Sequence, residues 1–162
     1  HAQTEMNPAL WTFLFCLARL AWFLVQLVFC YDGNQWPEVK RGHHVSTRDH
    51  WMVKPTQCIL DAFNMQWITA VGEAEVQLAL MNNAGIVDAV MIDDSDVFVF
   101  GAKTVLQNLT LSPNATIKMY TMSAIQEHVE PCLTGDVFVT MAICCGGNYN
   151  TAGQLSYRHF SH

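Results

Sequence analysis

The stretch from Gly72 to Gly101 constrains the fold of this 162-residue chain more than any other part. It reads GEAEVQLALMNNAGIVDAVMIDDSDVFVFG, with paired carboxylates on both sides of an apolar middle. The pattern predicts a helix over residues 73–83, a closing turn over residues 83–85 and a buried strand over residues 86–92. A buried strand without alternation is typical of a parallel sheet. The stretch therefore predicts an α/β fold.

The two carboxylate pairs lie at the start of the predicted helix and just after the predicted strand. Glu73 and Glu75 form the first pair, and Asp94 and Asp96 form the second. Like charges this close repel and raise each other's pKa values, a penalty that bound cations remove. Because carboxylate oxygens are ligands that Mg²⁺ prefers, the pairs predict a site for hard divalent cations. The alternative is that neither pair binds a cation. Glutamates are favourable at a helix start in any protein, and Asp-Asp-Ser-Asp can equally form a capping turn.

A fifth acid, Asp32, follows an apolar run near the N-terminus. That run predicts a buried strand over residues 25–31, ended by the turn residues Asp32-Gly33-Asn34. Open α/β sheets place their sites beyond the carboxyl ends of such strands. Asp32 is therefore either a further ligand of the predicted cation site or simply a turn residue.

The apolar run over residues 10–29 is also nearly long enough to span a membrane. Arg19 lies at its centre, where an arginine costs about 2.5–3.5 kcal/mol on insertion scales. We therefore expect a buried helix over residues 8–22, with Asn7 as its N-cap and Pro8 in its first turn. A membrane-anchored protein stays a less favoured alternative.

The rest of the chain predicts short helices and strands. Helices are expected over residues 55–63, 123–128 and 135–145. Strands are expected over residues 65–70, 97–100, 104–106 and 117–120, and a turn over residues 112–114. The six cysteines form no CxxC pair, and most lie in apolar runs, so we expect buried, reduced thiols.

Composition limits the classes of protein. About half of the residues are hydrophobic (51%), which excludes a disordered chain, and the length suits one domain with a core. The net charge of −6 argues against a surface that is basic everywhere. Four of the eight Lys and Arg residues gather in residues 37–54, among them Lys40, Arg41 and Arg48. This segment either contacts phosphates or is a solvated loop or helix face.

Two runs of the sequence carry a family resemblance. The run GEAEVQLALMNNAGIVDAVMIDDSDVFVFGAKTVLQN closely resembles the internal nuclease region of the XPG/flap endonuclease superfamily. The end of the N-terminal region of that superfamily resembles a second run, VQLVFCYDGNQWPEVKRG. Together, the two runs are most similar in sequence to fungal GEN/XPG-like nucleases. The resemblance covers roughly residues 7–153. It implies a PIN-like α/β fold with a central, mostly parallel sheet flanked by helices.

The resemblance also implies an organisation for the chain. Residues 1–162 would form a single XPG-type nuclease domain. Residues 1–55 would be the end of the N-terminal region with an arch-like segment, and residues 56–150 the internal nuclease region.

The function implied by the resemblance is hydrolysis of DNA phosphodiesters at flaps or junctions in the nucleus. The family uses two Mg²⁺ or Mn²⁺ ions and no small-molecule cofactor, and its partner is branched or flapped DNA. Matched motif by motif, the implied metal ligands are Asp32, Glu73, Glu75, Asp94 and Asp96. Lys40 and Asp94 take catalytic roles, with Lys40 at the scissile phosphate, and Lys40, Arg41 and Arg48 contact DNA.

The sequence departs from the family pattern in three places. Asn148, in Gly-Gly-Asn-Tyr-Asn, stands where the family has a further acidic ligand. The earliest acid of the family would precede His1. The helix-two-turn-helix that grips duplex DNA is not recognisable in residues 151–162. We therefore expect weak or absent activity. The alternative is an inactive pseudonuclease fragment that binds DNA or a protein.

Overall fold

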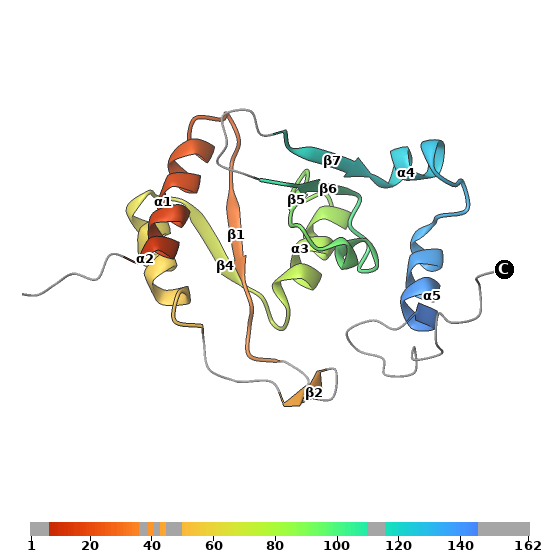
Figure 1. The fold of residues 1–162 in the computed structure, drawn as a ribbon, viewed down its shortest axis with the longest axis horizontal. Helices are drawn as coiled ribbons and strands as arrows, with labels where there is room; N and C mark the ends of the chain where they lie inside the picture. The colour runs from red at the N-terminus through yellow and green to blue at the C-terminus, as the bar shows by residue number, and fades with distance from the viewer. Residues whose placement is uncertain (1–6, 36–38, 41–42, 45–49, 110–115, 146–162) are drawn as a thin grey trace, which may run out of the picture.

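Helices and strands alternate along most of the chain, which gives a mixed α/β fold (Figure 1). A computed structural model describes residues 7–35, 39–40, 43–44, 50–109 and 116–145. The helices are α1 (Pro8–Leu20), α2 (Val53–Ala62), α3 (Ala74–Asn83), the 3₁₀ helix η1 (Ser95–Phe98), α4 (Met122–His128) and α5 (Gly135–Cys145). The strands are β1 (Val28–Tyr31), β2 (Val39–Lys40), β3 (His43–His44), β4 (Gln66–Thr69), β5 (Val90–Met91), β6 (Thr104–Gln107) and β7 (Lys118–Thr121).

The strands pair in three separate groups within the described residues. β1 and β4 are parallel, with Val28 opposite Gln66 and Tyr31 opposite Thr69. β5 and β6 are also parallel, and β7 joins β6 in the antiparallel sense. A short hairpin pairs β2 with β3. The α/β class is confirmed, but the expected central sheet is divided, and α3 contacts both main parts through β1 and β5.

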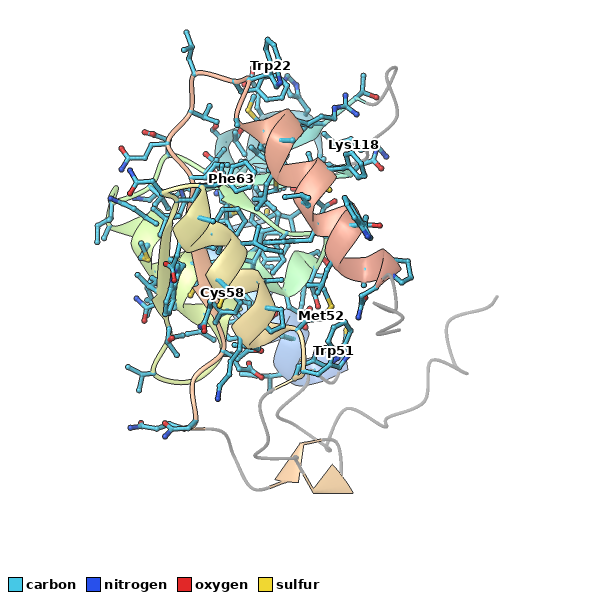
Figure 2. The ribbon with its side chains drawn as sticks, turned by 90° about the vertical axis from the view of Figure 1, so that its left-hand side faces the viewer. Trp22, Trp51, Met52, Cys58, Phe63 and Lys118 are labelled. Carbon is cyan, nitrogen blue, oxygen red and sulfur yellow. The ribbon has the colours of Figure 1, made fainter. Side chains whose placement is uncertain are left out.

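The N-terminal helix begins as its sequence predicts. The Oδ1 atom of Asn7 accepts a hydrogen bond from the Ala9 N–H at 3.2 Å, and proline occupies the first turn. Only Leu17 and Leu20 of α1 are buried. Trp22, beyond its C-terminus, is 88% exposed (Figure 2), so the expected burial of this segment was wrong in extent. Among the described residues, no helix is both long and apolar enough to cross a bilayer.

Helix α2 packs on β4 and α1. Leu60 is fully buried, and the Tyr31 hydroxyl of β1 donates a hydrogen bond to Thr56 Oγ1 at 2.9 Å. The outer face of α2 carries Cys58 (Figure 2). All six cysteines are free, as expected, but none is buried, so the prediction of buried thiols was wrong.

The main core lies between α3, β5, η1 and β6. Its buried residues are Ala79, Val90, Val97, Phe98, Ala102 and Val105. Two sequence predictions here need correction. Residues 97–100 form no strand, because the Oδ1 atom of Asp94 accepts the Asp96 N–H at 3.0 Å and starts a helical turn. The strand predicted over residues 86–92 shortens to β5, since Ile86 is 69% exposed beyond the turn at Gly85. The turn over residues 112–114 lies outside the described residues.

We expect Gly33→Ala to destabilise the fold by about 1–3 kcal/mol, because the added Cβ would overlap the main-chain carbonyl oxygen of Ala70. Gly135→Ala is the matched control, since a Cβ there meets no atom within 4 Å and alanine favours the helix. Urea unfolding followed by circular dichroism measures both variants. Equal stability of Gly33→Ala and the unchanged protein would contradict the close approach of the two segments.

Candidate active site

The first part of the site forms where the end of β1 meets the start of α3. After β1, the Gly33 N–H donates to the Gly72 carbonyl oxygen at 2.7 Å, and the Gln35 N–H donates to the Val71 carbonyl oxygen at 3.1 Å. These bonds bring the Asp32 side chain to the helix, where its Oδ1 accepts the Ala74 N–H at 2.8 Å. Asp32 therefore caps α3 from a distant part of the chain.

The capping bond places three predicted ligands at one helix end. Glu73 is the N-cap residue of α3 by position, although its side chain makes no capping hydrogen bond, and Glu75 lies in the first turn. Asp32 joins them from β1. The positive end of the helix dipole favours negative charge at this place. The structure thus brings Asp32 to the first carboxylate pair, and its role as a cation ligand stays a prediction.

The three carboxylates differ in their contact with water. Glu73 is buried, with 7% of its surface exposed, and its Oε2 atom is inaccessible. Glu75 is half-buried and Asp32 is exposed. The nearby thiol of Cys30 has a raised pKa, first because it is partly buried and second because the negative charge of Asp32 opposes the thiolate. Burial of a carboxylate such as Glu73 is costly unless positive charge or donors surround it.

The second pair lies in the turn between β5 and the core. Asp94 is exposed and caps η1, while Asp96 is half-buried in its first turn. Val97 and Phe98 follow at once and are buried in the core. Because η1 contacts α3, the same helix that carries the first pair also supports the second.

Carboxylate oxygens suit a hard cation, but the described carboxylates do not converge on a common coordination site. Within the described ranges, no group of three or more His, Cys, Asp or Glu side chains is placed to hold a metal ion. Lys40 lies in β2. Arg41, Arg48 and Asn148 lie outside the described residues. The assigned roles of all these residues stay predictions.

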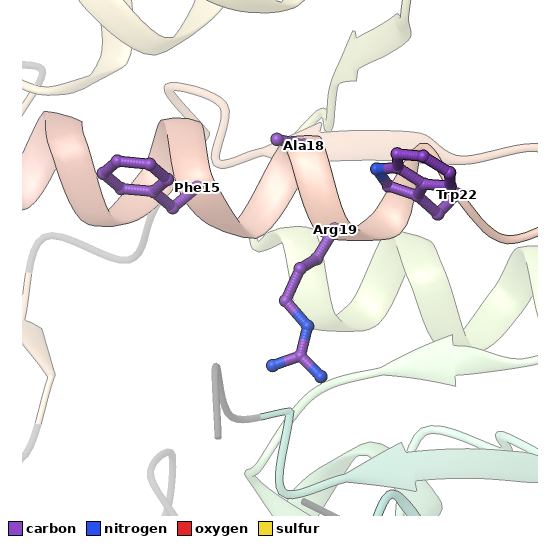
Figure 3. A pocket seen from close by; sticks show the side chains of 4 residues that line it. All are labelled: Phe15, Ala18, Arg19 and Trp22. Atoms are coloured by element: carbon purple, nitrogen blue, oxygen red, sulfur yellow. The ribbon is translucent and has the colours of Figure 1, made fainter. Parts of the chain in front are cut away.

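A pocket of about 350 Å³ lies apart from these acids (Figure 3). Phe15, Ala18, Arg19 and Trp22 line it, and they come from α1 and the turn that follows. Figure 3 shows the Arg19 side chain extending away from both aromatic rings. None of the four is a residue that the sequence predicts for the site. Arg19 is the one charged side chain among them, so these four residues offer no pair of catalytic groups.

Known proteins resemble the chain in sequence and in structure. Residues 64–148 match the family model described as the XPG I-region. Human Flap endonuclease GEN homolog 1 is 30% identical over 168 residues, which cover 91% of this chain and 18% of that protein. The catalytic core of Rad2 in complex with DNA substrate superposes with a TM-score of 0.75, 29% identity, and coverage of 90% of this chain and 48% of that one. The Holliday junction-resolving enzyme GEN1 in complex with product DNA, Mg²⁺ and Mn²⁺ gives a TM-score of 0.72, 26% identity, and coverage of 87% and 33%.

The fold is that of the core of XPG-type nucleases, which confirms the PIN-like class expected from the sequence. The chain belongs to the XPG family, since the I-region model matches more than half of its residues. The match includes both carboxylate pairs. The chain spans less than a fifth of the length of the human relative.

Variants of Asp32 separate its capping role from its charge. We expect Asp32→Ala to lower the free energy of unfolding by about 1 kcal/mol, because the Ala74 N–H loses its acceptor. Asp32→Asn keeps an oxygen acceptor at the same place and should lose much less. Urea unfolding without metal measures both. An equal loss in the two variants would contradict the capping role.

Proposed function

We propose that this chain is the nuclease domain of a structure-specific DNA endonuclease. It hydrolyses phosphodiesters at flaps or junctions, depends on Mg²⁺ or Mn²⁺, and acts in the nucleus on branched or flapped DNA. The single observation that carries the proposal is the XPG I-region match over residues 64–148, which contains both carboxylate pairs. The geometry at α3 supports it, because three acids with matching motifs lie at one helix end.

The residues that would hold the two cations are those of the acidic motifs: Asp32, Glu73, Glu75, Asp94 and Asp96. When bound, such cations stabilise charge on the attacking and leaving oxygens of a phosphodiester. The fold itself positions these acids. Asp32 joins β1 to α3, and the carboxylate of Glu73 is buried away from bulk water. Lys40, Arg41 and Arg48 would contact DNA phosphates, with Lys40 at the scissile one.

The expected activity is weak or absent. Asn148 removes one negative charge from the ligand set that the family motif predicts. In addition, the described acids form no group of three that is placed to hold a metal ion. Each of these features lowers the affinity for a divalent cation, because fewer charged oxygens reach it.

A cleavage assay on a 5′-flap and a four-way junction tests the proposal. We expect slow Mg²⁺-dependent cleavage at most, faster cleavage by Asn148→Asp because it restores a carboxylate, and none by Asp94→Ala. Heat-treated protein and EDTA serve as controls. Robust cleavage by the unchanged chain would overturn the expectation of weak activity. Cleavage that persists in Asp94→Ala would overturn the assigned site.

The second candidate function is a pseudonuclease module that keeps the fold and binds DNA or a protein without cleavage. The lack of a three-ligand group among the described residues favours it. Calorimetric titration with Mg²⁺ and Mn²⁺ discriminates between the two functions. Absence of cation binding by a chain that circular dichroism finds folded would support the pseudonuclease, whereas binding that Asp94→Ala abolishes would support the enzyme.

A further inference from the structure

The turn that carries Asp94 and Asp96 needs an anchor on its N-terminal side, because β5 has only two residues. Its pairing with β6 ends where the Ile92 N–H donates to the Leu106 carbonyl oxygen at 3.0 Å. Asp93 is the next residue and lies outside the strand. The contacts of Asp93 therefore help to fix the positions of Asp94 and Asp96, which follow it.

Asp93 is tied to the end of β6 by two hydrogen bonds. Its Oδ1 atom accepts the Asn108 N–H at 2.8 Å, and its main-chain carbonyl oxygen accepts the Gln107 Nε2 at 3.0 Å. Gln107 ends β6 and Asn108 follows it, so the two bonds extend the contact between β5 and β6 beyond the ladder.

The donor of the first bond is itself fixed. Asn108 has a φ of 64°, in the left-handed region that asparagine adopts more readily than most residues. Its Nδ2 atom donates to the Thr116 carbonyl oxygen at 3.1 Å. The Asn108 N–H is therefore held in a defined place on which the carboxylate of Asp93 can dock.

The other side of the turn is fixed by different means. Asp94 accepts the Asp96 N–H through its own side chain, and the next two residues, Val97 and Phe98, are buried in the core. The acids at 94 and 96 thus lie between a buried anchor and the contacts of Asp93.

We propose that Asp93 is a positioning residue, which holds the turn of Asp94 and Asp96 and is not itself a cation ligand. Its role in cation binding rests on the proposed function, because it acts through these two acids. The role requires an oxygen acceptor at position 93 and not a charge. Asparagine at position 93 should therefore keep the turn in place, whereas alanine should not. Groups that orient metal ligands typically contribute about 10–100-fold to metal affinity.

The test compares Asp93→Ala with Asp93→Asn. Asp88→Ala is the control, because it removes an exposed acid from the bend before β5. Cation affinity is measured by calorimetry with Mn²⁺, and the turn itself by amide hydrogen exchange of Asn108 and Asp96 without metal. We expect Asp93→Ala to weaken Mn²⁺ binding roughly 10-fold and to speed exchange at both amides. Asp93→Asn and Asp88→Ala should resemble the unchanged protein in both measurements.

Equal losses of Mn²⁺ affinity in Asp93→Ala and Asp93→Asn would overturn the proposal, because a ligand would be lost in both. Unchanged amide exchange in Asp93→Ala would overturn it as well, since the turn would not depend on the residue. If the unchanged protein binds no cation, the proposed function fails on its own. Faster exchange in Asp93→Ala but not in Asp93→Asn would then still support the positioning of the turn.

Discussion

The hydrogen bond from the Ala74 N–H to Asp32 Oδ1 joins the two parts of the chain on which the candidate site depends. It links the end of β1 to the start of α3 across forty-two positions of sequence. Because α3 also contacts β5 and η1, the orientation of this helix relates the β1–β4 pair to the second sheet. Loss of the cap would therefore disturb both the helix start and the relation between the carboxylate pairs.

The helix end that Asp32 caps also offsets the negative charge of the acids that gather at it. The amide groups and the dipole of a helix N-terminus favour negative charge, so Asp32, Glu73 and Glu75 gain from α3 some of what a cation would supply. Asp94 gains similarly from the amide of Asp96. A cation would have to compete with these bonds for some of the same oxygens.

Local sequence signals predicted most elements of the fold. Asn7 and Pro8 marked the start of α1, and the turn at Gly85 marked the end of α3. The prediction of a strand over residues 97–100 was wrong, because a short buried helical turn and a short buried strand have the same run of apolar residues. Only the capping side chain of Asp94 distinguishes the helical turn from a strand. The acids were identifiable by motif. The contacts that place them, from Asp32 to Ala74 and from Asp93 to Asn108, join distant residues and leave no pattern in the sequence.

The core and the acidic site use different side chains of some of the same elements. The core residues are apolar side chains of α3, β5, η1, β6 and the loop between η1 and β6, and none of the five implied ligands belongs to that cluster. Asp32 and Asp94 nevertheless contribute to the fold as well, since each caps a helix through its side chain. Substitution of either residue by alanine would therefore change the local fold as well as the charge of the site.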